Sequence, residues 1–295
     1  MQYFRPMSDD RDVTLLPIGD RDVTAVAAFL TAHLNSRVSP DAWAQAMRPG
    51  WPVDQPNHGF LLEAAGEVVG AYVAFYSERR IGGADHQICN LAAWCVLEEY
   101  RGHSLRLVRA MLGQRGYTFT DLSPSGAVVP LNLRLGFEQL DPTTSVAFNL
   151  PMPLWSRRVR VLSDPAEVEA ALTGENLRVF RDHRDARAAR HLVVLDQGRA
   201  CYVVYRRDRR KQLPLFATIL HVSDRAAFAR VRRHVLRHLA LHERVPFSLV
   251  ERRVAGAAPW PAIRLSSPRP KMFRSTDLSA GQVDYLYSEL TCVPW

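Results

Sequence analysis

The chain has 295 residues, 47% of them hydrophobic, which is enough for two domains of ordinary size with buried cores. Its net charge of +8 comes almost entirely from arginine, because lysine occurs only at positions 211 and 271. These arginines are spread along the chain, so we expect a phosphate-bearing ligand or an acidic protein as a partner, and no nucleic acid. The opening residues lack the apolar segment of a signal peptide and no stretch is as long as a membrane span. We therefore expect a cytoplasmic protein.

The cysteines and histidines do not form a metal-binding pattern. The cysteines lie apart in apolar surroundings, which is typical of buried free thiols: Cys89, Cys95, Cys201 and Cys292. Three histidines recur every fourth residue, so a helix would align them on one face: His234, His238 and His242. No carboxylate or cysteine is spaced to complete a site with them, and a solvated basic face is the simpler interpretation.

The first half begins with a predicted helix and three strands. Apolar residues at helical spacing predict an amphipathic helix from Asp20 to Leu34. Residues 59–64 and 68–76 are β-rich runs, and the Ala65-Gly66-Glu67 segment between them favours a hairpin. Residues 88–97 form a third apolar run of strand length.

Helices and strands then alternate. A helix is predicted over 104–114, a strand over 117–122, a short helix over 128–135 that ends at Gly136, and an extended segment to Leu150. This order predicts an α/β (α+β) fold, with a mixed, mostly antiparallel sheet flanked by helices.

The second half repeats this organisation. Two prolines within residues 151–156 indicate a linker, so we expect domains over 1–150 and 157–295. Residues 71–80 align without a gap on residues 201–210, with a shared Tyr-Val pair and a shared Arg-Arg pair. A helix, a hairpin glycine, a strand and a second helix flank the second copy in matching order. We therefore predict a tandem duplication of one fold.

One segment of the first half combines a strand end, a tight turn and a helix start. It reads Val96-Leu-Glu-Glu-Tyr-Arg-Gly-His-Ser-Leu-Arg106. The free backbone N–H groups and the positive end of the helix dipole at such a turn suit phosphate binding, although an ordinary strand-to-helix connection has the same geometry.

This segment, Val-x-x-Glu-Tyr-Arg-Gly before a helix, resembles the acyl-CoA motif of the GNAT (GCN5-related N-acetyltransferase) superfamily. Leu-x-Leu-Gly-Phe at 133–137 is similar to the C-terminal signature of that superfamily. The resemblance covers about residues 13–150, and over the second half it is architectural. It implies two GNAT-like domains, of which the second is degenerate.

The resemblance also implies an N-acyltransferase that moves an acyl group from a thioester to an amine of a small molecule or peptide. The donor, acetyl-CoA, a longer acyl-CoA or an acyl carrier protein, would place its phosphates on residues 101–106 and its pantetheine arm along residues 94–96. The expected donor-binding residues are Trp94, Cys95, Val96, Arg101, Gly102, His103, Ser104, Leu105, Arg106 and Ser125. A backbone N–H near Val96 would stabilise the oxyanion.

The sequence departs from this pattern at two places. Ser104 and Arg106 stand where the superfamily has small residues, so the backbone is less open to a donor, although Arg106 adds positive charge. Asn132 stands where many members carry a tyrosine that protonates the thiolate, and an amide delivers no proton. These changes also suit a rival interpretation, a non-catalytic GNAT-like module that binds a protein or nucleotide.

A general base is still expected, because the attacking amine must be neutral. Asp121 and His86 border the expected cleft and are the candidates, with Asn132 as a further residue of the catalytic site. Ser123 and Ser125 follow in a rigid turn, where they either contact the ligand or cap the next helix. The run Arg206–Lys211 is predicted to be an exposed hairpin tip suited to an acidic carrier protein, and the apolar segment 285–295 is predicted to pack between the halves.

Overall fold

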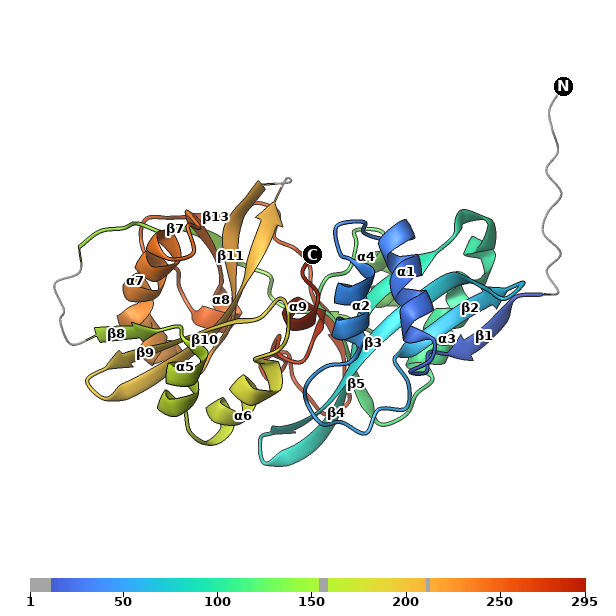
Figure 1. The fold of residues 1–295 in the computed structure, drawn as a ribbon, viewed down its shortest axis with the longest axis horizontal. Coiled ribbons are helices and arrows are strands. Elements are labelled where there is room, and N and C mark those ends of the chain that lie inside the picture. The colour runs from blue at the N-terminus through green and yellow to red at the C-terminus, as the bar shows by residue number, and fades with distance from the viewer. Residues whose placement is uncertain (1–11, 154–158, 211–212) are drawn as a thin grey trace, which may run out of the picture.

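The computed structural model describes residues 12–153, 159–210 and 213–295. The expected linker lies partly outside these residues, as do residues 1–11 at the start. The described chain forms two seven-stranded mixed sheets that lie side by side (Figure 1). Across the described residues, no helix is long and apolar enough to cross a bilayer.

The first sheet is built around the hairpin that the sequence predicts. Its order is β1 (Thr14–Pro17), β2 (Gly59–Ala64), β3 (Glu67–Ile81), β4 (Ala84–Val96), β5 (Tyr117–Asp121), β14 (Met272–Arg274) and β6 (Glu138–Gln139). The second sheet has the order β13 (Ala262–Arg264), β7 (Thr144–Phe148), β12 (Phe247–Glu251), β11 (Leu213–Val222), β10 (Arg199–Arg210), β9 (Arg190–Asp196) and β8 (Val159–Leu162). All neighbours are antiparallel except β4–β5 and β11–β12.

Helices cover both faces of each sheet. In the first half they are α1 (Val23–His33), α2 (Pro40–Met47), the 3-10 helix η1 (Glu98–His103), α3 (Ser104–Leu112) and α4 (Val128–Arg134). In the second half they are α5 (Pro165–Ala171), α6 (Gly174–His183), α7 (Arg225–Leu241), α8 (Arg252–Ala255) and α9 (Glu289–Cys292). Helices α1 and α2 pack on one face of the first sheet and α3 on the other, and α5, α6 and α7 are placed in the same way on the second.

The two halves exchange one strand each. Strand β7 belongs to the first half in sequence but pairs with β12 and β13 in the second sheet. In return, β14 from the second half pairs with β5 and β6 in the first sheet. The sheets therefore do not follow the expected boundary after residue 150, because each is completed by backbone hydrogen bonds to a strand from the other half.

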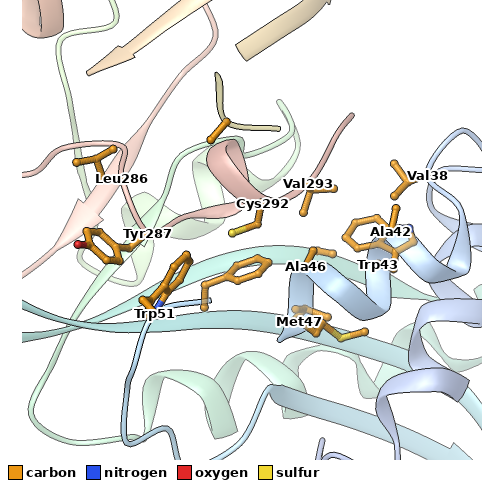
Figure 2. Close-up of a cluster of buried hydrophobic side chains, with 14 of the residues drawn as sticks. Val38, Ala42, Trp43, Ala46, Met47, Trp51, Leu286, Tyr287, Cys292 and Val293 are labelled. Atoms are coloured by element: carbon orange, nitrogen blue, oxygen red, sulfur yellow. The ribbon is translucent and has the colours of Figure 1, made fainter. Parts of the chain in front are cut away.

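A shared hydrophobic core joins the halves. The cluster contains Trp43 and Trp51 from the first half and Phe180 and Tyr202 from the second. The C-terminal segment fills the space between them, and Figure 2 shows Tyr287, Cys292 and Val293 of this segment against the side chains of α2 and Trp51. Trp51 and Tyr287 are in edge contact, with ring centroids 5.0 Å apart. The predicted packing of residues 285–295 is confirmed.

Strands β3 and β10, which carry the internal sequence match, hold the same position in their sheets, because β3 is third counted from β1 and β10 is third counted from β8. The gapless alignment is nevertheless wrong by one residue. Tyr72 faces α3, whereas its aligned partner Tyr202 belongs to the cluster formed with α1, α2, α5 and α6. Because side chains alternate along a strand, a register error of one residue moves each side chain to the opposite face.

Candidate active site

A cavity of about 430 Å³ opens where β4 and β5 separate. The two parallel strands pair from Gln87–Tyr117 to Asn90–Thr120, and the ladder stops there. Beyond it, β4 continues to Val96 along an edge that β5 does not cover. A bulge at Ala92–Ala93 interrupts the pairing of β4 with β3 at the same level. The two strands therefore separate beside residues 94–96, where the pantetheine arm is expected.

The first half supplies one wall of this cavity. Trp94 of β4 lines it and stacks on Tyr72, with ring centroids 5.2 Å apart and planes 20° from parallel. Asp121, at the end of β5, and the turn that follows it as far as Ser125 complete this wall. Ser125 uses its backbone carbonyl to begin α4, and the first residue before that helix, Ala127, provides no side-chain cap.

Asp121 is a buried carboxylate, with 5% of its surface exposed. It accepts a hydrogen bond of 2.8 Å from the amide Nδ2 of Asn132. Burial raises the pKa of Asp121 to about 7, the nearby charge of Glu289 adds to this rise, and the hydrogen bond from Asn132 opposes it. Asn132 thus holds and orients the carboxylate.

Glu289 is another buried carboxylate beside the cavity, and it was not predicted as a site residue. Its Oε1 accepts a hydrogen bond of 2.7 Å from the Ser123 hydroxyl, and its backbone N–H donates to Asn90. Its Oε2 has no hydrogen-bond partner among the described residues. Burial raises the pKa of Glu289 as well. The two carboxylates therefore share one low-dielectric region, and each disfavours ionisation of the other.

The second half supplies the other wall, which is rich in charge. Its charged residues are Arg206, Asp208, Arg210, Glu251, Arg269 and Lys271. Arg269 forms an ion pair with Asp208 at 3.2 Å, and Lys271 forms a buried ion pair with Glu251. This wall was not predicted, and the prediction that the whole run 206–211 forms an exposed tip is wrong, because Arg206 is 2% exposed. Lys211 lies outside the described residues.

The expected phosphate-binding turn lies apart from the cavity, at the far end of the open β4 edge. Arg101 and Gly102 are exposed in η1, and no side chain caps the N-terminus of α3. A Cβ at Gly102 would meet nothing within 4 Å, and its φ is not positive, so neither packing nor backbone conformation requires glycine there. Arg106 is turned away from the turn, because its guanidinium donates to the carbonyl of Val13 at 2.9 Å.

In the second half, a side chain caps the corresponding helix start. Helix α7 follows β11 as α3 follows β4, but the Asp224 carboxylate accepts hydrogen bonds from the N–H groups of Ala226 and Ala227, at 2.7 and 2.9 Å. A negative side chain therefore occupies the position where a phosphate would lie. The start of α3 has no such side-chain cap, so the two halves differ at this position.

Other residues expected at the site lie elsewhere or have limited roles. His86 pairs with Arg79 near the distal hairpin of β3 and β4, about 26 Å from Trp94 at the usual rise per residue, and it does not line the cavity.

Burial raises the pKa of the Cys95 thiol, which disfavours a thiolate nucleophile. Leu105 is 47% exposed beside the turn, and the ring nitrogen Nδ1 of His103 accepts a hydrogen bond of 3.3 Å from Arg106. Within the described residues, no group of potential ligands is arranged to hold a metal ion.

No protein-family model matches the chain, and no curated protein matches it. Solved structures do match. A proposed acetyltransferase from Pyrococcus horikoshii is 12% identical and has a TM-score of 0.59, and the alignment covers 99% of this chain and 98% of that one. A GCN5-related N-acetyltransferase from Anabaena variabilis is 11% identical, with a TM-score of 0.58 and coverage of 89% and 72%. Another from Kribbella flavida is 17% identical, with a TM-score of 0.54 and coverage of 91% and 72%.

These identities are too low to carry over a substrate, but the structural agreement defines the fold. The chain has the GNAT fold in tandem, with two mixed sheets of the same order that exchange one strand each. The predicted fold class is confirmed.

Proposed function

We propose that the chain is an N-acyltransferase whose first half binds an acyl-CoA donor and whose cavity between the sheets holds the amine acceptor. The observation that carries this proposal is the uncovered edge of β4, which runs from the uncapped start of α3 to the buried Asp121. An acyl-CoA donor fits this edge if its phosphates lie at the start of α3 and its thioester lies beside Asp121.

The backbone of β4 supports this placement. Leu97 donates its N–H to Val69 of β3. Because N–H groups alternate in direction along an antiparallel strand, the N–H of Val96 and that of Trp94 point to the uncovered edge. These donors suit the amide groups of a pantetheine arm. The bulge at Ala92–Ala93, beside the cavity, redirects the backbone and is a suitable place for an N–H that stabilises the oxyanion.

The start of α3 supports a phosphate site. The helix dipole favours an anion there, no side chain caps the helix, and the open space at Gly102 allows close approach to the backbone. The exposed Arg101 adds a positive charge, since its contact with Glu98 is a solvent-exposed ion pair at 3.4 Å. Arg106 is committed to Val13, and so it is not included among the phosphate ligands.

Asp121 is the proposed general base. A carboxylate with a pKa of about 7 is ionised in part at neutral pH and accepts a proton more readily than an ordinary aspartate. In the proposed step, the amine nitrogen attacks the thioester carbonyl carbon and its proton passes to Asp121. The C–S bond then breaks, the thiolate leaves with the electron pair, and an amide remains. Asn132 positions the base and transfers no proton.

An acyl carrier protein as the donor stays a prediction. A second groove, of about 380 Å³, adjoins the cavity through Asp208 and Trp295 and is lined by Arg187, Arg190, Arg207 and Arg209. Such a basic surface supports an acidic partner, whereas CoA needs only the turn and the β4 edge.

Thermal unfolding in the presence of acetyl-CoA and longer acyl-CoAs tests the donor site. We expect a rise in Tm with at least one of them, which Arg101→Glu removes. The matched control is Arg115→Glu, which makes the same charge change beyond the opposite end of α3 and should keep the rise. If no acyl-CoA and no acyl carrier protein raises the Tm, the proposal is wrong. A donor that binds but acylates no amine would favour the non-catalytic module.

A further inference from the structure

Arg206 is a buried arginine whose guanidinium group is only partly hydrogen-bonded. It lies in the middle of β10, is 2% exposed, and lines the cavity that holds Asp121. Its Nη1 donates to the carbonyl of Leu290 at 3.1 Å. Its Nε and Nη2 are buried and have no hydrogen-bond partner among the described residues.

These two nitrogens form one edge of the planar guanidinium group. Their N–H bonds run nearly parallel, in the fork that binds both oxygens of a carboxylate side-on. Polar groups that are buried this deeply are normally paired, so an unpaired fork on a residue that lines the cavity indicates a missing partner. The geometry of the fork favours a planar anion as that partner.

The other charges around the cavity do not satisfy this fork. Asp208 is the carboxylate whose charge acts most strongly on Arg206, but its oxygens accept hydrogen bonds from Thr218, Arg269 and the N–H of Arg209 instead. The ammonium of Lys271 lies on Glu251. Arg210 donates to the carbonyl of Ser267. Two guanidinium groups, Arg206 and Arg210, therefore remain without a carboxylate within ion-pair distance in the described chain, and this wall carries an excess of positive charge.

The opposite wall has the complementary property. Asp121 and Glu289 lie in one buried region, and the charge of Glu289 acts on Asp121 and, more weakly than that of Asp208, on Arg206. An acceptor that enters the cavity thus meets a proton-accepting carboxylate on one side and a cation on the other. A molecule with an amine at one end and an anion at the other matches both walls.

We propose that the acyl acceptor is an amino acid whose carboxylate binds the Nε–Nη2 edge of Arg206 while its amine faces Asp121. This inference rests on the proposed acyltransferase function and names its acceptor class. Arg206 binds the acceptor and takes no part in proton transfer. The cavity volume of about 430 Å³, shared with the thioester end of the donor, suits a single amino acid.

The first experiment measures CoA release from acyl-CoA with paired acceptors. The panel contains α- and ω-amino acids, the amide of each, and phosphoethanolamine as an amine with a tetrahedral anion. We expect kcat/KM to be about 10- to 100-fold higher for an acid than for its amide, which is the effect of a charged hydrogen-bonded pair. Equal rates for acids and amides would overturn the inference and leave the acyltransferase proposal intact. A preference for phosphoethanolamine would overturn the carboxylate assignment.

Variants of Arg206 test whether the preference for acids over amides depends on its guanidinium group. Arg206→Gln should remove the preference for the acid mainly through KM, and Arg206→Lys, which keeps the charge but lacks the fork, should restore part of it. The matched control is Arg199→Gln at the exposed start of the same strand, which should keep the full preference. An unchanged preference in folded Arg206→Gln would overturn the assignment.

A binding measurement covers the case in which no amine is acylated. Ligand-observed NMR with the same acids and amides, on the wild-type protein saturated with CoA, should show binding of acids and weaker or no binding of amides. If no acid binds, the inference is wrong. If acids bind but no acyl transfer occurs, the carboxylate site stands and the acyltransferase proposal fails.

Discussion

Asp121 and Glu251 end the two strands that receive the exchanged strands, and both line the same cavity, yet their surroundings differ. Asp121 pairs in register with Met272 of β14 and accepts a hydrogen bond from a neutral amide. Glu251 pairs with Thr144 of β7, forms an ion pair with Lys271 and accepts a hydrogen bond from the Tyr285 hydroxyl. Glu251 is therefore held by a cation, whereas Asp121 is held by a neutral group.

The raised pKa of Asp121 predicts a specific effect of pH on stability. The pKa is about 7 in the fold and about 3.8 in the unfolded chain, so the unfolded state releases this proton first, and Asp121 makes the fold less stable as the pH rises through this window. Asp121→Asn should therefore be more stable than the wild type above pH 7, by at most roughly 4 kcal/mol, and the difference should vanish near pH 4. Denaturant unfolding across this range measures it, with the exposed Asp85→Asn as control. A less stable Asp121→Asn at pH 8 would refute the pKa assignment.

Replacement of the α7 cap should affect stability and leave donor binding unchanged. The hydrogen bonds from Ala227 and Ala226 hold the pKa of Asp224 below its ordinary value, so the stabilisation is present above pH 4 and is lost as the pH falls further. We expect Asp224→Ala to lower the Tm at pH 7 and to lower it less in acid. The rise in Tm with acyl-CoA should be unchanged. Its loss would show that the second half contributes to the donor site.

The shared core predicts that the two halves unfold together. Trp51 is 4% exposed, donates its indole N–H to the carbonyl of Tyr76 at 2.8 Å, and contacts the C-terminal segment (Figure 2). Trp51→Ala should destabilise the protein by about 3–5 kcal/mol. Trp260→Ala, at an 84% exposed position, is the matched control with little expected effect. Calorimetry of the wild type should show one transition, and two separated transitions would contradict a common core.

Local patterns predicted most of the elements. The strand at Gly59–Ala64 has the expected bounds, because a short apolar run is followed at once by a turn. The helix after the phosphate-binding turn begins at Ser104 as predicted. Helix α2 (Pro40–Met47) was missed, although Ser39 caps it and proline occupies its first turn, which are signals that the sequence contains.

The strand exchange could not be predicted in the same way. The sequence of Thr144–Phe148 identifies an extended segment, but a strand forms the same backbone hydrogen bonds in either sheet. The choice depends on tertiary packing between segments more than 100 residues apart in the chain, such as Thr144 and Glu251.

For the site, sequence reasoning found the first wall and missed the second. Asp121 was found because it ends a strand beside the expected cleft. Arg206 was missed because a run of charged residues usually indicates an exposed face, whereas the strand continues through it and turns every second side chain inward. Glu289 was missed because a single carboxylate in an apolar segment has no local pattern.

The pH dependence of kcat/KM for acyl transfer, compared between the wild type and Asp121→Asn, tests the proposed mechanism most directly. The wild-type value should rise tenfold per pH unit and level off near pH 7, where Asp121 becomes ionised. Asp121→Asn should be slower on the order of 100- to 10,000-fold and should lack this inflection, while His86→Gln should keep both the rate and the profile. An Asp121→Asn enzyme with the wild-type rate and the wild-type inflection would contradict the assignment of Asp121 as the base.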